Sequence, residues 1–288
     1  MSSFTHQIAP DLLHYYRASD PSVTLNRLEC LGLSDQMNSI TRFSSRVENY
    51  AKYRPGYPPG LLEILQSECG LTKEAVIADI GSGTGLLSEV FLKNGNAVFG
   101  IEPNELMRAK AESLPKSFAH FRSVPATAEN TTLPDASIDF ITAGQTFHWF
   151  DREAAKQEFT RILKPEGWVA LVWNARRLDS TAFLREYEGL LLRYSPDYPV
   201  VRHENIEDGI GEFFAPQPTT SASLENIQRL DFESLKGRLC SSSYAPEAGQ
   251  RNFELMLSEL RDVFNTHNEN GVVNFEYDTK VYYGHLRC

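Results

Sequence analysis

The residues whose types and spacing point most clearly to chemistry are one aspartate and three alternating glycines. Asp79 lies near the end of the apolar run 76–80, and Gly81, Gly83 and Gly85 follow it. Glycine has no Cβ, so it permits a tight turn and the close approach of a ligand to the backbone. A carboxylate beside such a turn would repel a pyrophosphate but attract a cationic ligand. The pattern therefore predicts a ligand-binding turn at the end of a buried strand.

A second acid, Glu102, ends the next apolar run, 98–102. A carboxylate at that place can accept hydrogen bonds from both hydroxyls of an adenosine ribose. The glycine spacing differs from the Gly-x-Gly-x-x-Gly fingerprint of dinucleotide-binding proteins, because Leu86 stands at the third glycine's position and Gly85 comes one residue early. This spacing disfavours NAD and FAD.

A parallel α/β sheet is needed to bring these residues together. The strand at 76–80, the glycine turn and an amphipathic helix from Leu86 form the first unit of a nucleotide-binding fold, with the ligand at the strand's carboxyl end. Further strands are expected at 98–102, 119–124, 138–143, 168–173, 220–230 and 272–285. Helices are expected at 60–67, 104–114, 152–163, 231–238 and 247–265. Proline and glycine predict a turn at 164–167.

With these motifs in order, the sequence resembles the class I S-adenosylmethionine-dependent methyltransferases, specifically their small-molecule "type 11" group. Besides the glycine turn and the acid of the second strand, the resemblance rests on Ala128-Glu129, the stretch 145–150 and the stretch 163–167. It covers about residues 43 to 175 well and the remainder loosely. It implies an α/β fold with a Rossmann-like, seven-stranded, mostly parallel sheet whose last strand is antiparallel, together with a helical cap insertion and an N-terminal helical extension.

The resemblance implies S-adenosylmethionine as the cofactor and S-adenosylhomocysteine as the product. The residues expected to bind the cofactor are Arg54, Asp79, Gly81, Ser82, Gly83, Gly85, Glu102, Pro103, Ala128, Glu129 and Gln145. Arg54 either forks to the methionine carboxylate or makes a surface ion pair. Many relatives carry an acid where this chain has Thr127, so Glu129 either takes over that acid's contact with adenine or caps the next loop.

The loop 144–151, at the carboxyl end of the fourth strand, is where a substrate would meet the cofactor. The catalytic candidates are Gln145, which can orient an acceptor, and His148, which is either a base for an alcohol or phenol or a packing histidine. The residues expected to bind the substrate are Tyr50, Tyr53, Tyr57, His148, Trp149, Trp173 and Tyr244. Arg176 and Arg177 follow the fifth strand and are expected to face solvent, with an anionic substrate as the alternative.

Four regions are predicted along the chain. Residues 1–41 form an N-terminal helical extension, 42–177 the cofactor-binding core, 178–217 a helical substrate cap, and 218–288 the C-terminal part of the core. The first region either covers the domain or forms oligomers, and no oligomeric state is predicted.

Composition restricts the partners. The 288 residues are 41% hydrophobic and 23% charged, as in an ordinary protein with a large core. A formal net charge of -10 disfavours nucleic acid, since no basic stripe is present to displace counterions. No metal is implied, because the loop after the fourth strand lacks clustered carboxylates. Four cysteines without paired spacing, and no long apolar run, predict a cytoplasmic protein with reduced thiols and no membrane insertion.

The predicted reaction is the transfer of a methyl group from S-adenosylmethionine to a small, partly hydrophobic acceptor, at a carboxylate or hydroxyl oxygen. In-line displacement requires mainly alignment, with the nucleophile and the methyl carbon about 3 to 3.5 Å apart. The alternatives are a C- or N-methyltransferase acting on a natural-product-like substrate, and an S-adenosylmethionine-binding regulator without catalysis.

Overall fold

The computed structural model describes residues 46–114, 118–195, 198, 209–242, 244–246, 248–250 and 252–287. The extension predicted for residues 1–41 lies outside this range.

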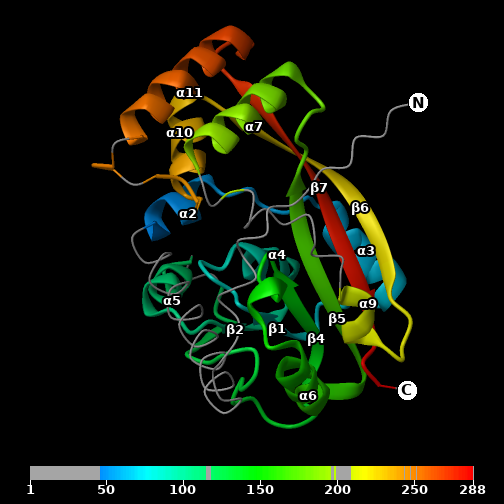
Figure 1. Cartoon of the computed structure of the whole chain (residues 1–288). Coiled ribbons are helices and arrows are strands. Elements are labelled where there is room, and N and C mark those ends of the chain that lie inside the picture. Colours follow the sequence, from blue (N-terminus) through cyan, green and yellow to red (C-terminus); the bar gives the residue numbers. More distant parts are fainter. Residues whose placement is uncertain are drawn as a thin grey trace, which may run out of the picture. The chain divides into compact units, whose positions relative to one another are not determined.

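A mixed β-sheet forms the centre of the described part of the chain (Figure 1). Its strand order is β3-β2-β1-β4-β5-β7-β6. All neighbouring pairs are parallel except those that β7 makes with β5 and β6. The predicted Rossmann-like sheet with an antiparallel last strand is thereby confirmed. The strands are β1 (Val76–Ile80), β2 (Ala97–Ile101), β3 (Phe121–Val124), β4 (Ile138–Gly144), β5 (Leu163–Arg176), β6 (Thr220–Leu230) and β7 (Val273–Gly284).

Helices cover both faces of this sheet, because successive strand residues point to opposite sides. In β1, Ile77 packs with α3 and α4, whereas Ala78 packs in the cluster that includes α6 and α9. Several helices begin at a polar residue whose side chain accepts backbone N–H groups, as Asn104 does for α5 and Asp151 for α6. The helices are α2 (Val47–Tyr53), α3 (Gly60–Cys69), α4 (Leu86–Asn94), α5 (Glu105–Glu112), α6 (Arg152–Ile162), α7 (Ala182–Tyr194), α9 (Ile210–Phe214), α10 (Phe232–Cys240) and α11 (Phe253–His267), with a 3-10 turn η2 (Phe147–Trp149).

The turn predicted at 164–167 is an error of the sequence prediction. These residues lie inside β5, which already pairs with β4 at Leu163 opposite Ile138 and pairs again at Trp168 opposite Phe140. Between these two pairs the chain advances five residues along β5 but only two along β4. The segment with the proline and the glycine therefore forms an irregularity within a strand. The strand continues because residues on both sides of the irregularity find partners on β4.

A second hydrophobic cluster unites α7, α10 and α11 with the ends of β6 and β7. In Figure 1 these helices lie together beyond the end toward which β5 runs. This packing does not follow the predicted boundary between a cap at 178–217 and a returning core at 218–288, because α10 and α11 belong to the second range. The short helix α9, from the first range, packs in the core cluster instead. We refer to α7, α10 and α11 as the cap.

Candidate active site

The turn between β1 and α4 holds its three glycines in conformations that other residues rarely adopt. The φ angle is +66° at Gly81, +56° at Gly83 and +86° at Gly85. A β-carbon would lie 2.8 Å from Thr146 at the first position and 2.9 Å from Leu114 at the third. At the middle position it would meet nothing closer than a carbonyl oxygen at 4.0 Å. The space over Gly83 is therefore open to a ligand that approaches the backbone.

Glu102 fastens this turn to the end of β2. One carboxylate oxygen accepts the backbone N–H of Gly83 at 3.0 Å, and the other accepts that of Asn104 at 2.8 Å. The backbone N–H of Ser82 donates to the carbonyl of Ile101 at 3.1 Å. Burial raises the pKa of the Glu102 carboxyl. Each carboxylate oxygen has a further lone pair, so the acid can shape the turn and still accept from a ribose.

Asp79 lies beneath the same turn with 0% of its surface exposed. Its carboxylate accepts hydrogen bonds from the hydroxyls of Ser88 at 2.6 Å and Thr142 at 3.2 Å. Burial raises the pKa of Asp79 to about 7, against the opposing effect of these hydrogen bonds. The carboxylate thus faces the protein interior, and it would act on a bound cation through its electric field.

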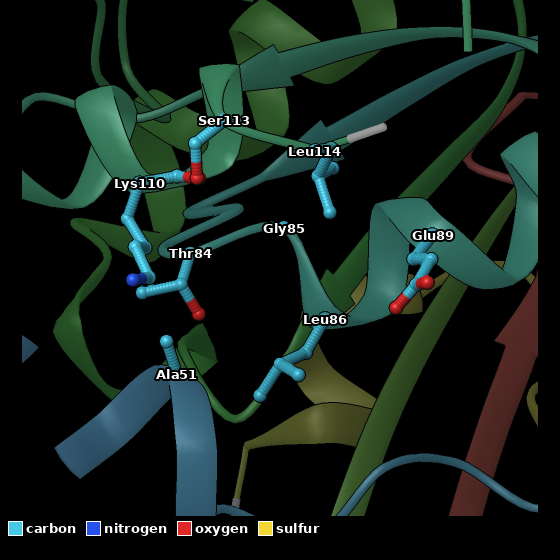
Figure 2. A pocket seen from close by; sticks show the side chains of 8 residues that line it. All are labelled: Ala51, Thr84, Gly85, Leu86, Glu89, Lys110, Ser113 and Leu114. Carbon is cyan, nitrogen blue, oxygen red and sulfur yellow. The ribbon is translucent and has the colours of Figure 1, made fainter. Parts of the chain in front are cut away.

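A hollow of about 180 Å³ borders the glycine turn on the side of α2, α4 and α5. Figure 2 shows Thr84 between Ala51 of α2 and Lys110 of α5, with Leu86 at the start of α4 on another side of the hollow. The buried hydroxyl of Thr84 has no hydrogen-bond partner among the described residues. Ligand pockets commonly measure 300 to 1,000 Å³, so this hollow alone is too small for S-adenosylmethionine.

Gln145 opens the loop after β4 with a strained backbone. Its φ of +63° is unusual for a residue with a side chain, and its N–H donates to the carbonyl of Val172 at 3.0 Å. The side-chain amide donates to the carbonyl of Asn174 at 3.3 Å. Its amide oxygen is buried without a hydrogen-bond partner among the described residues. Strain together with an unsatisfied acceptor is typical of a ligand site.

Aromatic rings surround His148 on the 3-10 turn that follows. Its ring centroid lies 4.4 Å from that of Trp149 and 5.2 Å from that of Trp173 at the end of β5. Trp149 is 39% exposed, whereas Trp173 is buried. Three residues predicted to bind the substrate are therefore brought together at the carboxyl edge of the sheet.

The segment 46–57, which we call the strap, crosses this edge. Asn174 of β5 and Asn226 of β6 both donate to the carbonyl of Gly56, at 3.2 and 2.9 Å. Gln228 donates to the carbonyl of Tyr53 at 2.9 Å. Asn174 was not among the site residues predicted from the sequence. An amide directly after the apolar run of a strand could have pointed to it.

The three tyrosines predicted in the strap reach different surroundings. The hydroxyl of Tyr57 lies against Gly144 at the end of β4, and burial raises its pKa well above the usual value. The ring of Tyr53 packs instead against Gly237 of α10. The ring of Tyr50 lies 4.9 Å from the guanidinium carbon of Arg54.

The arginines show one correct and one wrong expectation. Arg177 has 29% of its side chain exposed and forms an ion pair with Asp278 at 2.7 Å, as a surface residue does. Arg176, expected to face solvent, has only 10% of its side chain exposed and is paired with Glu188 of α7. The cap folds over the end of β5 and buries it. Arg54, by contrast, makes no ion pair among the described residues. It donates to the carbonyl of Ser241 at 3.0 Å.

The remaining predicted cofactor residues lie near the ends of β2, β3 and β4. Glu129 accepts the backbone N–H of Asp151 at 3.0 Å, which is the capping role that the sequence left as one alternative. Ala128 is buried in the core, and Pro103 is exposed with its carbonyl bound to Arg108. Tyr244, which was predicted to bind the substrate, lies beside the cap. Its ring centroid is 4.8 Å from that of another tyrosine.

The described residues lack two kinds of feature. They contain no group of three histidine, cysteine or acidic residues that could hold a metal ion. None of their helices has the length and apolar character needed to cross a membrane.

Comparison with known proteins gives consistent findings. The family described as "Methyltransferase domain" matches residues 78–171. An uncharacterised methyltransferase of Schizosaccharomyces pombe is 32% identical over 139 residues, which are 46% of this chain and 53% of the relative. An uncharacterised methyltransferase of Geobacillus sp. is 30% identical over 166 residues, 56% of this chain and 74% of the relative. The chain thus spans about half the length of the yeast relative.

A solved structure also resembles this chain. It is that of a putative type II methyltransferase from Anaeromyxobacter dehalogenans, with a TM-score of 0.63 and 25% sequence identity. The similarity covers 82% of this chain and 99% of the other. The similarity therefore extends well beyond the glycine turn.

Proposed function

Because this chain belongs to the class I S-adenosylmethionine-dependent methyltransferases, we propose that it transfers a methyl group from S-adenosylmethionine to a small, partly hydrophobic acceptor, at an oxygen atom. The observation that carries the proposal is the turn after β1, where Gly83 leaves open space directly beside Glu102. The donors and acceptors around that space suit an adenosine ligand with a cationic end.

Three groups would hold the cofactor. Glu102 would accept the ribose hydroxyls, since its oxygens keep lone pairs beyond those that bind the turn. The unsatisfied amide oxygen of Gln145 would accept the ammonium of the methionine end. Asp79, buried below, would favour the positive charge through its field once it is ionised. When bound, the cofactor supplies an electrophilic methyl group on a cationic sulfur.

The residues at the carboxyl edge would position the acceptor. Trp173 and His148 form an aromatic wall next to Gln145, and the strap closes the same edge through Tyr57. A carboxylate acceptor is already ionised at neutral pH, so it needs orientation and no base. A hydroxyl acceptor needs deprotonation, and His148 is then the group to remove the proton. The net charge of -10 supports a small molecule over a nucleic acid as the partner.

Calorimetric titration with S-adenosylmethionine, S-adenosylhomocysteine and NAD tests the proposal. The first two should bind and NAD should not. Gly83→Val should abolish binding, because a side chain would fill the open space. Gly70→Val is the matched control: Gly70 also has a positive φ, +66°, and open space around it, but it lies at the end of α3. It should cost stability and leave binding unchanged.

Two results would count against the proposal. If the wild-type protein bound neither adenosine ligand, the cofactor assignment would be wrong. If it bound them but produced no S-adenosylhomocysteine with any acceptor in a metabolite pool, the non-catalytic regulator would be favoured.

A further inference from the structure

Three arginines, one buried and two half-buried, gather between the strap, the end of β5 and the cap. They are Arg54, Arg176 and Arg238 of α10, which we call the arginine cluster. The guanidinium carbons of Arg176 and Arg238 lie 5.9 and 5.6 Å from the ring centroid of Phe275. Arg54 and Arg238 both donate to the residues directly after α10, Arg54 to Ser241 at 3.0 Å and Arg238 to Ser242 at 3.1 Å.

Among the described residues, the arginine cluster has more positive than negative charge. Arg176 is paired with Glu188. Neither Arg54 nor Arg238 has a carboxylate partner within the part of the chain that the structure describes, and Arg238 is only 6% exposed. The pKa of Arg54 is lowered by its burial and by repulsion from Arg238. The pKa of Arg238 is raised, because its tyrosine neighbours outweigh the effect of its burial. A buried charge without a counterion costs several kcal/mol in proteins, so this arrangement favours a bound anion.

Several donors of the arginine cluster and of its neighbour Tyr187 are unused. Within the described residues, Nε of Arg54, Nη1 of Arg176 and the hydroxyl of Tyr187 are buried without a hydrogen-bond partner. Tyr187 is 1% exposed, and the guanidinium carbon of Arg176 lies 5.3 Å from its ring centroid. Buried polar groups in native proteins are nearly always paired. A carboxylate can accept several such donors at once, because its two oxygens offer four lone-pair sites.

We propose that the methyl acceptor is an organic acid, and that the arginine cluster holds a carboxylate of this acid beneath the cap. The inference rests on the proposed function and adds the substrate class to it. A carboxylate held by guanidinium groups is a weak nucleophile, since its lone pairs are engaged. The methylated oxygen therefore belongs to a second group of the acceptor, a hydroxyl or another carboxylate, which reaches the edge near Gln145.

For such an acceptor, the transfer forms one bond and breaks one bond. A lone pair of the second group's oxygen forms the new O–CH3 bond, and the electron pair of the broken C–S bond remains on sulfur. A carboxylate acceptor becomes a neutral methyl ester at that position. A hydroxyl acceptor also gives up its proton, for which His148 is the base.

The competing explanation is that the arginine cluster receives the carboxylate of the cofactor's methionine end, as predicted for Arg54 from the sequence. The two explanations differ in which ligand depends on the arginines. S-adenosylhomocysteine carries that carboxylate, whereas 5′-methylthioadenosine lacks it. If the arginines serve the acceptor, both ligands bind a cluster variant as they bind the wild type.

The test is calorimetry with C4 to C6 dicarboxylates and hydroxy acids, each compared with its amide, in the presence of saturating S-adenosylhomocysteine. At least one acid should bind the wild type about tenfold more tightly than its amide, a difference of about 1.4 kcal/mol. Arg238→Met should lose about tenfold or more in affinity for that acid, since it removes a charged hydrogen bond to the carboxylate. Its affinity for S-adenosylhomocysteine should stay unchanged.

Arg177→Met is the matched control, because Arg177 follows Arg176 in β5 but forms its ion pairs at the surface. It should leave both affinities unchanged. Arg54→Met, on a different element, provides a second variant should Arg238→Met fail to fold. The comparison of acid with amide in the wild type needs no variant.

The proposal is overturned if no acid binds more tightly than its amide, or if the cluster variants bind the acid like the wild type. It is also overturned if Arg238→Met loses affinity for S-adenosylhomocysteine but not for 5′-methylthioadenosine, because the arginine cluster would then serve the cofactor. Absence of any adenosine-ligand binding to the wild type would instead refute the proposed function, and acid binding measured without cofactor separates that case.

Discussion

Replacing Asp79 by asparagine should make the protein more stable at neutral and alkaline pH while impairing its use of the cofactor. Asparagine keeps the shape of the side chain and can still accept a hydrogen bond from Ser88 or Thr142. It cannot ionise, so the cost of holding a buried carboxylate disappears. Such opposite effects on stability and function are expected where a binding group is kept in an unfavourable environment.

The magnitude follows from the pKa of the carboxyl. Burial raises it from 3.8 to about 7 in the folded protein. The folded state therefore holds the proton more tightly than the unfolded chain, so the stabilisation is complete below the unfolded pKa and is lost as the pH rises through the folded pKa. Each pKa unit corresponds to about 1.36 kcal/mol, which gives a loss of about 3 kcal/mol between about pH 5 and about pH 8. Asp79→Asn should escape that loss.

Urea denaturation of both proteins at the two pH values measures this effect, because the midpoint shift at constant slope reports stability. The stability difference between the variant and the wild type should grow by about 3 kcal/mol toward the higher pH. Asp139→Asn is the control: its carboxylate is paired with Lys164 at 2.7 Å, so its removal should bring no gain in stability. A pH-independent difference between Asp79→Asn and the wild type would refute the reasoning.

The same variant gives a functional readout. S-adenosylmethionine carries a positive sulfur and S-adenosylhomocysteine does not, so an ionised Asp79 should favour the former. Asp79→Asn should lower the ratio of the two affinities in calorimetry at about pH 8, where the wild-type carboxyl is mostly ionised. An unchanged ratio would mean that its field does not reach the bound sulfur.

Three further substitutions have distinct expected outcomes. Gln145→Gly should stabilise the protein by about 1 kcal/mol in urea denaturation, since glycine adopts a positive φ without strain, and should weaken S-adenosylmethionine binding in calorimetry. His148→Ala should strongly reduce S-adenosylhomocysteine formation with a hydroxyl acceptor and only mildly with a carboxylate acceptor, because only the hydroxyl needs a base. Asn174→Ala should cost about 1 to 3 kcal/mol, because it leaves the hydroxyl of Thr279 without its acceptor, and should speed proteolysis within the strap, residues 46–57.

Each of these expectations has its own contrary result. Ala136→Gly relieves a similar positive φ, +48°, in the exposed loop before β4, and should match the stability gain of Gln145→Gly without affecting the cofactor. A loss of stability in Gln145→Gly would show that its side chain matters more than the backbone strain. Equal effects of His148→Ala on both acceptor types would make the histidine structural. Unchanged proteolysis in Asn174→Ala would mean that other contacts hold the strap.

The strands and the glycine turn could be predicted from the sequence because their signals are local. The run 220–230 was predicted as a strand and is β6 with the same bounds. The alternating glycines Gly81, Gly83 and Gly85 predict a tight turn whatever surrounds them, since only glycine adopts such angles freely. Glu102 could be placed at the end of the next strand because its signal is also local: the apolar pattern of a strand is visible within a few residues.

The contacts of the site side chains depended on the tertiary structure. Asp79 follows the predicted pattern, yet its hydrogen bonds come from Ser88 and Thr142 on different elements. Arg176 comes from the end of a strand, where sequence alone favours solvent. Whether its charge is buried depends on α7, which supplies Glu188 and Tyr187 from another part of the chain. Periodicity determines which face of an element is apolar, whereas the burial and charge balance of a group depend on contacts between residues far apart in the sequence.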